Sequence, residues 1–244
     1  KSFHLPLDAS PDEIAAAVAK VKEAGILLYA GGVIGMKTEE QVHQAFDWLR
    51  SERIESLNLV VEEYRHRVTG AAHYHLAADN PENVFLVALR TVPEDSSGVA
   101  HILEHTVLCG SEHYPVRDPF FMMIRRSLNT FMNAFTSSDW TAYPFASQNK
   151  KDFNNLMDVY LDAVFFASLN ELDFAQEGHR IEFAKTDDPN SELTFKGVVF
   201  NEMKGAMSSP PSQLWQNLSS HLFHRLGPKS ASKHRQFSEH SPFE

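Results

Sequence analysis

The segment HILEH at residues 101–105 places two histidines and a glutamate at the spacing of a metal site. On an α-helix, residues 101, 104 and 105 lie on one face, because neighbours in space are three and four apart in sequence. Two imidazoles one turn apart can bind one Zn²⁺, with the carboxylate of Glu104 beside the same ion. The glutamate precedes the second histidine, which reverses its place in the HExxH metal motif. The segment predicts a metal-binding helix and requires a third ligand from elsewhere.

Three glutamates are candidates for the third ligand, since a catalytic zinc has three protein ligands and a water. Glu202 is the lone carboxylate of the mainly apolar stretch 197–205, where an unpaired charge would be costly. Glu177 and Glu182 are alternatives, although an ion pair with Arg180 or a neighbouring strand is the favoured interpretation of both. Spacing alone does not choose among them.

Cys109 is the only cysteine of the sequence, so the chain cannot form an internal disulfide. Histidines and carboxylates must therefore provide the metal ligands. A reducing compartment, either cytoplasm or an organelle matrix, is expected, and the localisation is otherwise open.

Hydrophobic periodicity predicts an α+β fold with an antiparallel or mixed sheet flanked by helices. A buried strand at residues 83–90 leads, through possible N-cap residues at 95–98, into the helix that carries the metal motif. The other predicted strands lie at 57–61, at 71–77, and as a short pair between 129 and 145. Residues 180–183 form either a further strand or the start of a helix. The other predicted helices lie at about 120–128, 152–167 and 195–207.

The two ends of the chain have different patterns from the centre. Residues 1–50 predict helix (11–22), strand (25–30) and helix (38–49), which is similar to part of a sugar-phosphate isomerase barrel. That class would need more strands than the sequence provides. Residues 227–244 are polar and basic and are expected to be disordered. The predicted domains are therefore 1–50, 51–226 and a tail from 227.

Composition excludes two further classes of protein. The net charge of −10 opposes a phosphate-binding surface, so no nucleic acid partner is expected. No apolar run approaches the roughly 18 residues of a membrane span. With 43% hydrophobic residues, 244 residues are enough for one large or two small folded domains. An acidic surface suits a basic peptide, although solubility is its more common role.

A longer set of motifs resembles the presequence protease family of the pitrilysin-type (M16, inverzincin) zinc metallopeptidases. The resemblance covers residues 54–215, and its motifs are GVAHILEH at 98–105, LCGS at 108–111, PVRDPF at 115–120, NTFMNAFT at 129–136, DWTAYP at 139–144 and VFNEMKG at 199–205.

The resemblance implies a role for each matching residue. His101, His105 and Glu202 resemble the zinc ligands, and Glu104 resembles the general base that activates water. Asn133, Ala134 and Phe135 are similar to the edge strand that receives the substrate peptide. Some relatives carry a helper carboxylate seven residues before the last ligand; this chain has Phe195 there.

The expected function is thus a zinc metalloendopeptidase domain that degrades short unfolded peptides. The family has four related domains in two halves, and this sequence matches the first domain alone. A C-terminal half or partner domain is therefore expected to be required. The alternative is a non-catalytic pitrilysin-like subunit, or an inactive fragment that binds zinc.

Overall fold

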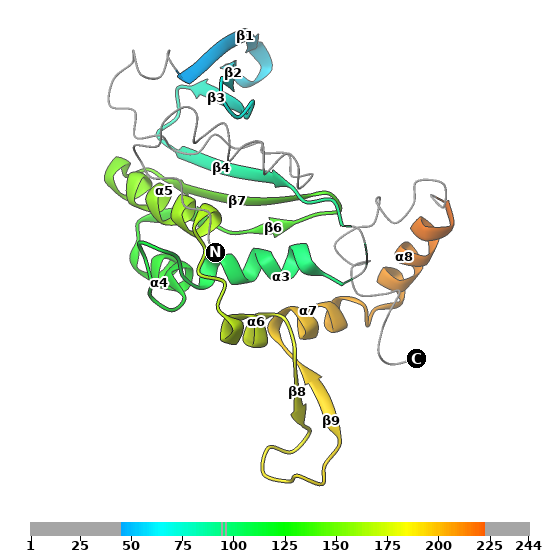
Figure 1. The fold of residues 1–244 in the computed structure, drawn as a ribbon. Helices are drawn as coiled ribbons and strands as arrows, with labels where there is room; N and C mark the ends of the chain where they lie inside the picture. The colour runs from blue at the N-terminus through cyan, green and yellow to red at the C-terminus, as the bar shows by residue number, and fades with distance from the viewer. Residues whose placement is uncertain (1–44, 94, 96, 223–244) are drawn as a thin grey trace. The chain divides into compact units, whose positions relative to one another are not determined.

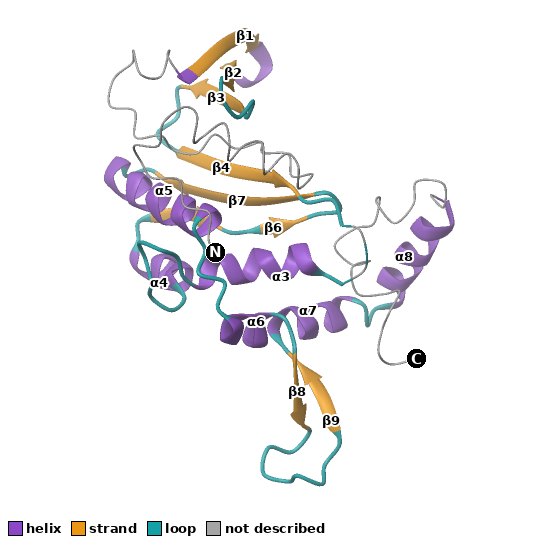
Figure 2. Ribbon diagram, viewed as in Figure 1, coloured by secondary structure: helices purple, strands orange, loops and turns teal. Residues whose placement is uncertain are grey.

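Alternating strands and helices make up the part of the chain that a computed structural model describes, residues 45–222 apart from 94 and 96 (Figures 1 and 2). The strands are β1 (Phe46–Ile54), β2 (Leu59–His66), β3 (Ala72–Ala78), β4 (Asn83–Arg90), β5 (Asn129–Met132), β6 (Phe135–Thr136), β7 (Trp140–Ser147), β8 (Arg180–Phe183) and β9 (Leu193–Lys196). The helices are η1 (Glu55–Leu57), α3 (Val99–Thr106), η2 (Val107–Cys109), α4 (Pro119–Arg126), α5 (Lys150–Phe165), α6 (Glu171–Glu177), α7 (Val198–Ala206) and α8 (Pro210–Leu222). The predicted α+β class, antiparallel sheets with flanking helices, is confirmed.

Two compact units share the chain, and each is built from separated segments. Within the described residues, unit 1 holds the chain up to Arg90 together with Leu128–Met132 and Tyr143–Met157. Unit 2 holds Thr91–Ser127, Asn133–Ala142 and the chain from Asp158 onward. The predicted helix 11–22, strand 25–30 and tail 227–244 lie outside the described residues. The division at residues 50 and 227 stays a prediction, and β1 crosses the first of these positions.

Unit 1 contains an antiparallel sheet in the order β1-β2-β3. The predicted turn between β2 and β3 is present, and Gly70 adopts a positive φ of 73° there, a conformation that glycine tolerates without strain. The predicted helix over 38–49 is wrong for its described end, because residues 46–49 belong to β1. Cross-strand contacts decide this: the Arg50 and Glu63 side chains pair at 2.7 Å, and the Phe46 and His66 rings stack with centroids 5.0 Å apart.

A second sheet has the order β4-β7-β5, and β6 also pairs with β7. Seven of the eight residues of β7 are buried, as expected for a strand covered on both faces. In unit 1 the Phe145 ring lies between those of Phe85 and Phe153, at 5.4 and 5.3 Å. In unit 2 Phe135 and Thr136 of β6 pair with Ala142 and Thr141 of β7.

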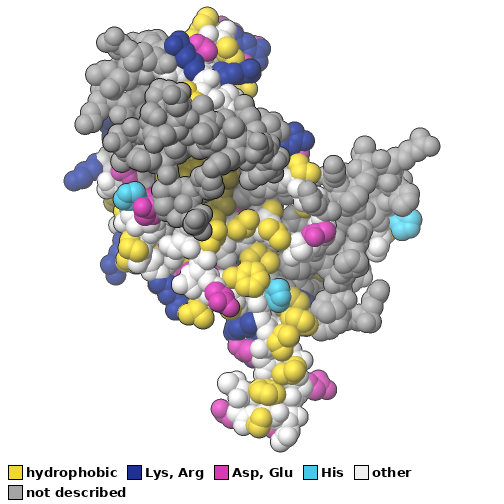
Figure 3. All heavy atoms as spheres, viewed as in Figure 1, with side chains coloured by type: hydrophobic (Ala, Val, Ile, Leu, Met, Phe, Trp, Pro, Cys, Tyr) yellow, Lys and Arg dark blue, Asp and Glu magenta, His cyan; other side chains and the backbone are white. Residues whose placement is uncertain are grey.

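Unit 2 packs α3 against α6 and α7. Ile102 of α3 and Val199 and Met203 of α7 form a buried apolar cluster. The prediction that a helix begins at Phe195 is wrong, because residues 193–196 pair with β8 as strand β9 and α7 begins at Val198. The β8–β9 hairpin exposes apolar side chains, including Ile181 and Leu193 (Figure 3).

Gly197 allows the β9–α7 junction to approach the end of α6. A Cβ atom at residue 197 would overlap the carbonyl of Gly178, the residue that follows α6. No side chain fits at that point without backbone movement. The close approach sets how α7 lies relative to α6, and both helices carry carboxylates of the site described next.

Candidate functional site

Helix α3 carries the HILEH segment, as predicted. It begins after Gly98, which has a positive φ of 75° and forms the N-cap without a side-chain hydrogen bond. The N-cap thus falls within the predicted residues 95–98, and Gly98 caps the helix through its backbone carbonyl, which accepts a hydrogen bond from Ile102 N at 3.0 Å. The Asp95 carboxylate accepts a hydrogen bond from the Ser97 backbone at 2.9 Å. His101, Ile102 and Glu104 are buried in the folded unit.

His101 and His105 lie side by side on this helix, with ring centroids 5.1 Å apart. Glu202 of α7 reaches both rings: its Oε2 is 3.5 Å from His101 Nε2 and 3.7 Å from His105 Nε2. The ligand atoms of the three residues all lie within 4.8 Å of one another. The structure therefore brings together the three residues that the sequence singled out.

The donor set fits zinc. Ligand atoms about 2.0–2.1 Å from a tetrahedral ion stand about 3.3 Å apart, close to the two nitrogen–oxygen distances given above. Two imidazoles and a carboxylate also match the ligand types of a catalytic zinc with one open position. The burial is uneven, because the His101 side chain is fully buried whereas that of Glu202 is 45% exposed.

Glu104 lies between the two histidines in sequence and is 4% exposed. Because it lies on the same helical turn as His105, its carboxylate is beside the histidine pair. It is not one of the three residues whose ligand atoms converge.

The second ring nitrogen of His105 contacts a carboxylate that the sequence did not identify in this role. His105 Nδ1 is 3.1 Å from Glu177 Oε2, and Glu177 is 6% exposed. The hydrogen bond to His105 is the largest cause that lowers the pKa of Glu177, and the positive charge of Arg117 adds to it. Glu177 thus lies outside the cluster of three converging ligand atoms and contacts the other ring nitrogen of His105.

Glu182, the other alternative, lies on β8 and forms ion pairs with Arg180 at 2.5 Å and with Lys196 at 2.9 Å. This is the role that the sequence favoured for it. The hydrogen bond from Lys196 is the largest cause that lowers the pKa of Glu182.

Of the predicted substrate residues, Asn133 and Ala134 lie between β5 and β6 and belong to neither strand, so the predicted edge strand is wrong for these two and β6 begins at Phe135. Phe135 opens this strand, and Asn133 precedes it, where its backbone carbonyl accepts a hydrogen bond from Tyr160 at 3.3 Å. Among the described strands β7 is the one that pairs with β6, and α3 packs against β6. An extended segment beside the histidine helix therefore has one strand edge that no described strand occupies.

Two further findings concern the reactivity of the Cys109 thiol and the length and polarity of the described helices. Burial raises the pKa of the Cys109 thiol to about 12, so the thiol is protonated at neutral pH. In the described part of the chain, every helix is too short or too polar to cross a bilayer.

Comparison with known proteins assigns this site to a class. Residues 90–208 match the family model described as Insulinase (Peptidase family M16). Over this segment the chain belongs to peptidase family M16, and the predicted resemblance is confirmed.

The curated relatives narrow the class further. The chain is 57% identical over 169 residues to the mitochondrial presequence protease of Xenopus tropicalis. This match covers 69% of this chain and 16% of that protein. Identity to the enzymes of the same name is 53% over 186 residues in Mus musculus and 52% over 174 residues in Kluyveromyces lactis. The match to the mouse protein covers 76% of this chain and 18% of that protein. The match to the yeast protein covers 71% of this chain and 18% of that protein. The chain thus spans about a sixth of the length of these relatives.

A crystal structure of pitrilysin is also similar, with a TM-score of 0.46 and 19% identity over 54% of this chain and 14% of that one.

Proposed function

We propose that this chain is the zinc-bearing part of a metalloendopeptidase that degrades short unfolded peptides. One observation carries the proposal: the ligand atoms of His101, His105 and Glu202 converge within 4.8 Å. The M16 match and the presequence protease relatives support it, because they assign the surrounding segment to a peptidase family. These relatives are named as mitochondrial, which favours a mitochondrial location.

The three residues would hold Zn²⁺, which supplies Lewis-acid activation of water and of a peptide carbonyl when it is bound. Glu104 would then act as the general base that takes a proton from the attacking water. The same carboxylic acid can return the proton to the amine that leaves. Its burial excludes bulk water from the proton transfer.

The substrate would lie extended along β6. Main-chain hydrogen bonds to Asn133, Ala134 and Phe135 would bind a peptide with little selectivity for sequence, as in other cases of strand addition. An extended peptide fits this mode, and a folded protein does not. The net charge of −10 favours basic peptides through long-range attraction.

The alternative is a fragment or subunit that binds zinc without hydrolysing peptides. This alternative is kept because the peptidase name belongs to relatives of which the chain covers 16% and 18%. A C-terminal half is the partner that would complete the enzyme.

The test combines metal content with peptide cleavage. Purified chain would be assayed for zinc stoichiometry and for cleavage of a short basic peptide, alone and with the remaining part of a presequence protease relative added. We expect one zinc per chain, and cleavage that depends on the added part. Zinc without cleavage in both conditions would support the non-catalytic alternative, and the absence of zinc would refute both.

The role of Glu104 has its own test. Glu104→Gln keeps the shape of the side chain but removes its basicity, so we expect full zinc content and a loss of roughly 10²- to 10⁴-fold in cleavage. Glu192→Gln, at an exposed position before β9, is the matched control and should cleave at the wild-type rate. Unchanged cleavage by Glu104→Gln, with zinc in place, would exclude this assignment.

A further inference from the structure

A line of polar contacts extends from His105 to the surface of unit 2. Glu177 Oε2 contacts the ring of His105, and its other oxygen, Oε1, accepts a hydrogen bond from Gln176 Nε2 at 2.9 Å. The side-chain oxygen of Gln176, Oε1, in turn accepts a hydrogen bond from Arg117 Nη2. Glu177 and Gln176 therefore each contact the residue nearer to the His105 ring through one side-chain atom and the residue nearer to the surface through another.

The direction of each hydrogen bond is fixed by chemistry. Arginine has donors alone, so the Gln176 oxygen must face Arg117 and the Gln176 amide hydrogens must face Glu177. The Glu177 carboxylate has acceptors alone, so it selects the His105 tautomer that carries a hydrogen on Nδ1. That tautomer leaves the Nε2 lone pair of His105 directed to the side of Glu202.

The outer end of the line is held by a loop that is itself anchored. Residues 110–118 connect η2 to α4, and Ser111 forms a bridge with Ala167. In the same loop, the His113 backbone donates to Asp162 Oδ2 at 2.9 Å, and the His113 ring contacts Asp162 Oδ1 at 2.6 Å. The loop backbone is thus fixed at Ser111 and His113 before the turn that leads to Arg117, and after it the Asp118 N–H donates to the Cys109 carbonyl at 3.2 Å.

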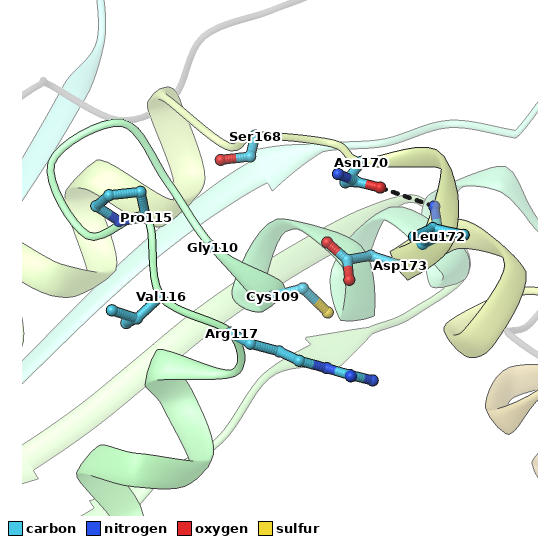
Figure 4. A pocket seen from close by; sticks show the side chains of 9 residues that line it. All are labelled: Cys109, Gly110, Pro115, Val116, Arg117, Ser168, Asn170, Leu172 and Asp173. Carbon is cyan, nitrogen blue, oxygen red and sulfur yellow. Dashed lines mark hydrogen bonds between the residues drawn. The ribbon is translucent and has the colours of Figure 1, made fainter.

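Arg117 also lines a pocket of about 310 Å³ between this loop and the start of α6 (Figure 4). Cys109, which follows the histidine helix, and Asp173 of α6 line the same pocket. The Arg117 side chain is 70% exposed, whereas that of Glu177 is 9% exposed. The line of contacts therefore passes from solvent to a buried carboxylate within three residues.

We propose that Arg117, Gln176 and Glu177 form a hydrogen-bonded relay that fixes the ring of His105 for metal binding. The proposal rests on the proposed function, because it assumes that His105 is a zinc ligand. Arg117 and Gln176 are positioning residues that act through Glu177.

The experiment measures zinc affinity by competition with a chelator, in the full chain and without peptide substrate. Removing a carboxylate that orients a ligating histidine weakens metal binding by about 10- to 100-fold, and this is the expectation for Glu177→Gln. Gln176→Met keeps the length of the side chain and removes its hydrogen bonds with Arg117 and Glu177. We expect zinc affinity to fall about fivefold, which corresponds to one net hydrogen bond. Arg117→Ala, at an exposed position, should cost about two- to threefold.

Matched controls remove the same residue types from unit 1. Arg67→Ala removes an exposed ion pair with Asp47, and Gln148→Ala removes an exposed hydrogen bond to Glu82. Both control variants should bind zinc as the wild type does.

A double variant separates a relay from three unrelated contacts. In a relay, Arg117→Ala has no further effect once Glu177→Gln has removed the inner carboxylate, since coupled residues are not additive. The ¹⁵N signals of the His105 ring in the metal-free chain give a second readout. They should report hydrogen on Nδ1 in the wild type and a mixture of tautomers in Gln176→Met.

The outcomes distinguish the two proposals. Wild-type chain without stoichiometric zinc would overturn the proposed function. Wild-type chain with zinc, but with Arg117→Ala and Gln176→Met indistinguishable from the controls, would overturn the relay alone. Additive losses in the double variant would also overturn it.

Discussion

Histidines gather in both units of this molecule, but their surroundings differ. In unit 1, His66 Nδ1 contacts the Thr69 hydroxyl at 2.8 Å, and the His66 ring stacks on Phe46. His73 lies on the next strand, with its ring 6.1 Å from that of Tyr64. In unit 2, His101 and His105 instead meet two glutamates from other helices.

The comparison shows that the carboxylates, more than the histidines, distinguish the metal site. His66 and His73 contact hydroxyl and aromatic neighbours in their sheet, whereas α3 lies against two helices that each bring an acidic residue to its histidines. Glu202 and Glu177, which contact His105, are 97 and 72 residues distant from it in the sequence. Tertiary packing therefore creates the site from one local motif.

The largest expected effect separates the two groups of histidines. His101→Ala removes a ligand, so zinc affinity should fall by more than the roughly 100-fold that loss of an orienting carboxylate can cause. His73→Ala should leave zinc stoichiometry and affinity unchanged. Chelator competition measures both variants, and a comparable loss in His73→Ala would show that the unit 1 histidines also contribute to metal binding.

A second effect tests the packing that brings α7 to the site. Gly197→Ala places a Cβ against the Gly178 carbonyl and should lower the free energy of unfolding by about 1–3 kcal/mol, as overpacking does. Gly205→Ala is the matched change in α7, where no atom lies within 4 Å of an added Cβ, and it should raise stability by about 0.5–1 kcal/mol. Urea denaturation measures both, and equal effects would refute the packing argument.

A smaller effect comes from His66 in the unit 1 sheet. Burial lowers the pKa of His66 below its usual value of 6.5. The unfolded chain then binds a proton more readily than the folded chain, so stability falls as the pH drops below about 6.5. The thermal midpoint of wild type, minus that of His66→Asn, should therefore decrease from pH 7.5 to pH 5.5. A constant difference would contradict the pKa argument.

The smallest effect has the opposite sign and lies in the loop of unit 2. The hydrogen bond to Asp162 raises the pKa of His113 above 6.5. Its contribution is present below pH 6.5 and is lost as the pH rises through the folded-state pKa. His113→Asn should therefore differ more from wild type at pH 6 than at pH 9 in the same thermal measurements. Solvent exposure of His113 keeps the difference small.

Local patterns predicted the fold where neighbours in sequence decide the structure. Helix α3, helix α5 and strand β4 agree with their predictions to within a few residues, because their periodicity is set by the face that they bury. The strand over residues 46–54 and the strand over 193–196 were missed. Both have pairing partners at a distance, and cross-strand contacts override local propensity there.

The candidate site shows the same limit. His101, Glu104 and His105 could be predicted from one helical turn. Glu202 stands out in the sequence as the lone carboxylate of its stretch, but the expected cost of burying its charge does not apply, because its side chain is 45% exposed. Glu177 was considered as a ligand, and its contact with the far side of the His105 ring could not be predicted from spacing. Nothing in the local sequence indicates which face of a histidine a distant carboxylate will approach.

The way in which the chain passes between the two units has a consequence for genetic dissection. Unit 1 takes Leu128–Met132 and Tyr143–Met157 from the middle of unit 2, and strand β7 itself begins in one unit and ends in the other. No single cut in the gene yields either unit whole. A truncation that begins at Thr91 would keep every residue of the metal site and still remove β4, the neighbour of β7 in its sheet. Residues 90–208, which match the family model, are therefore not expected to fold when they are expressed alone.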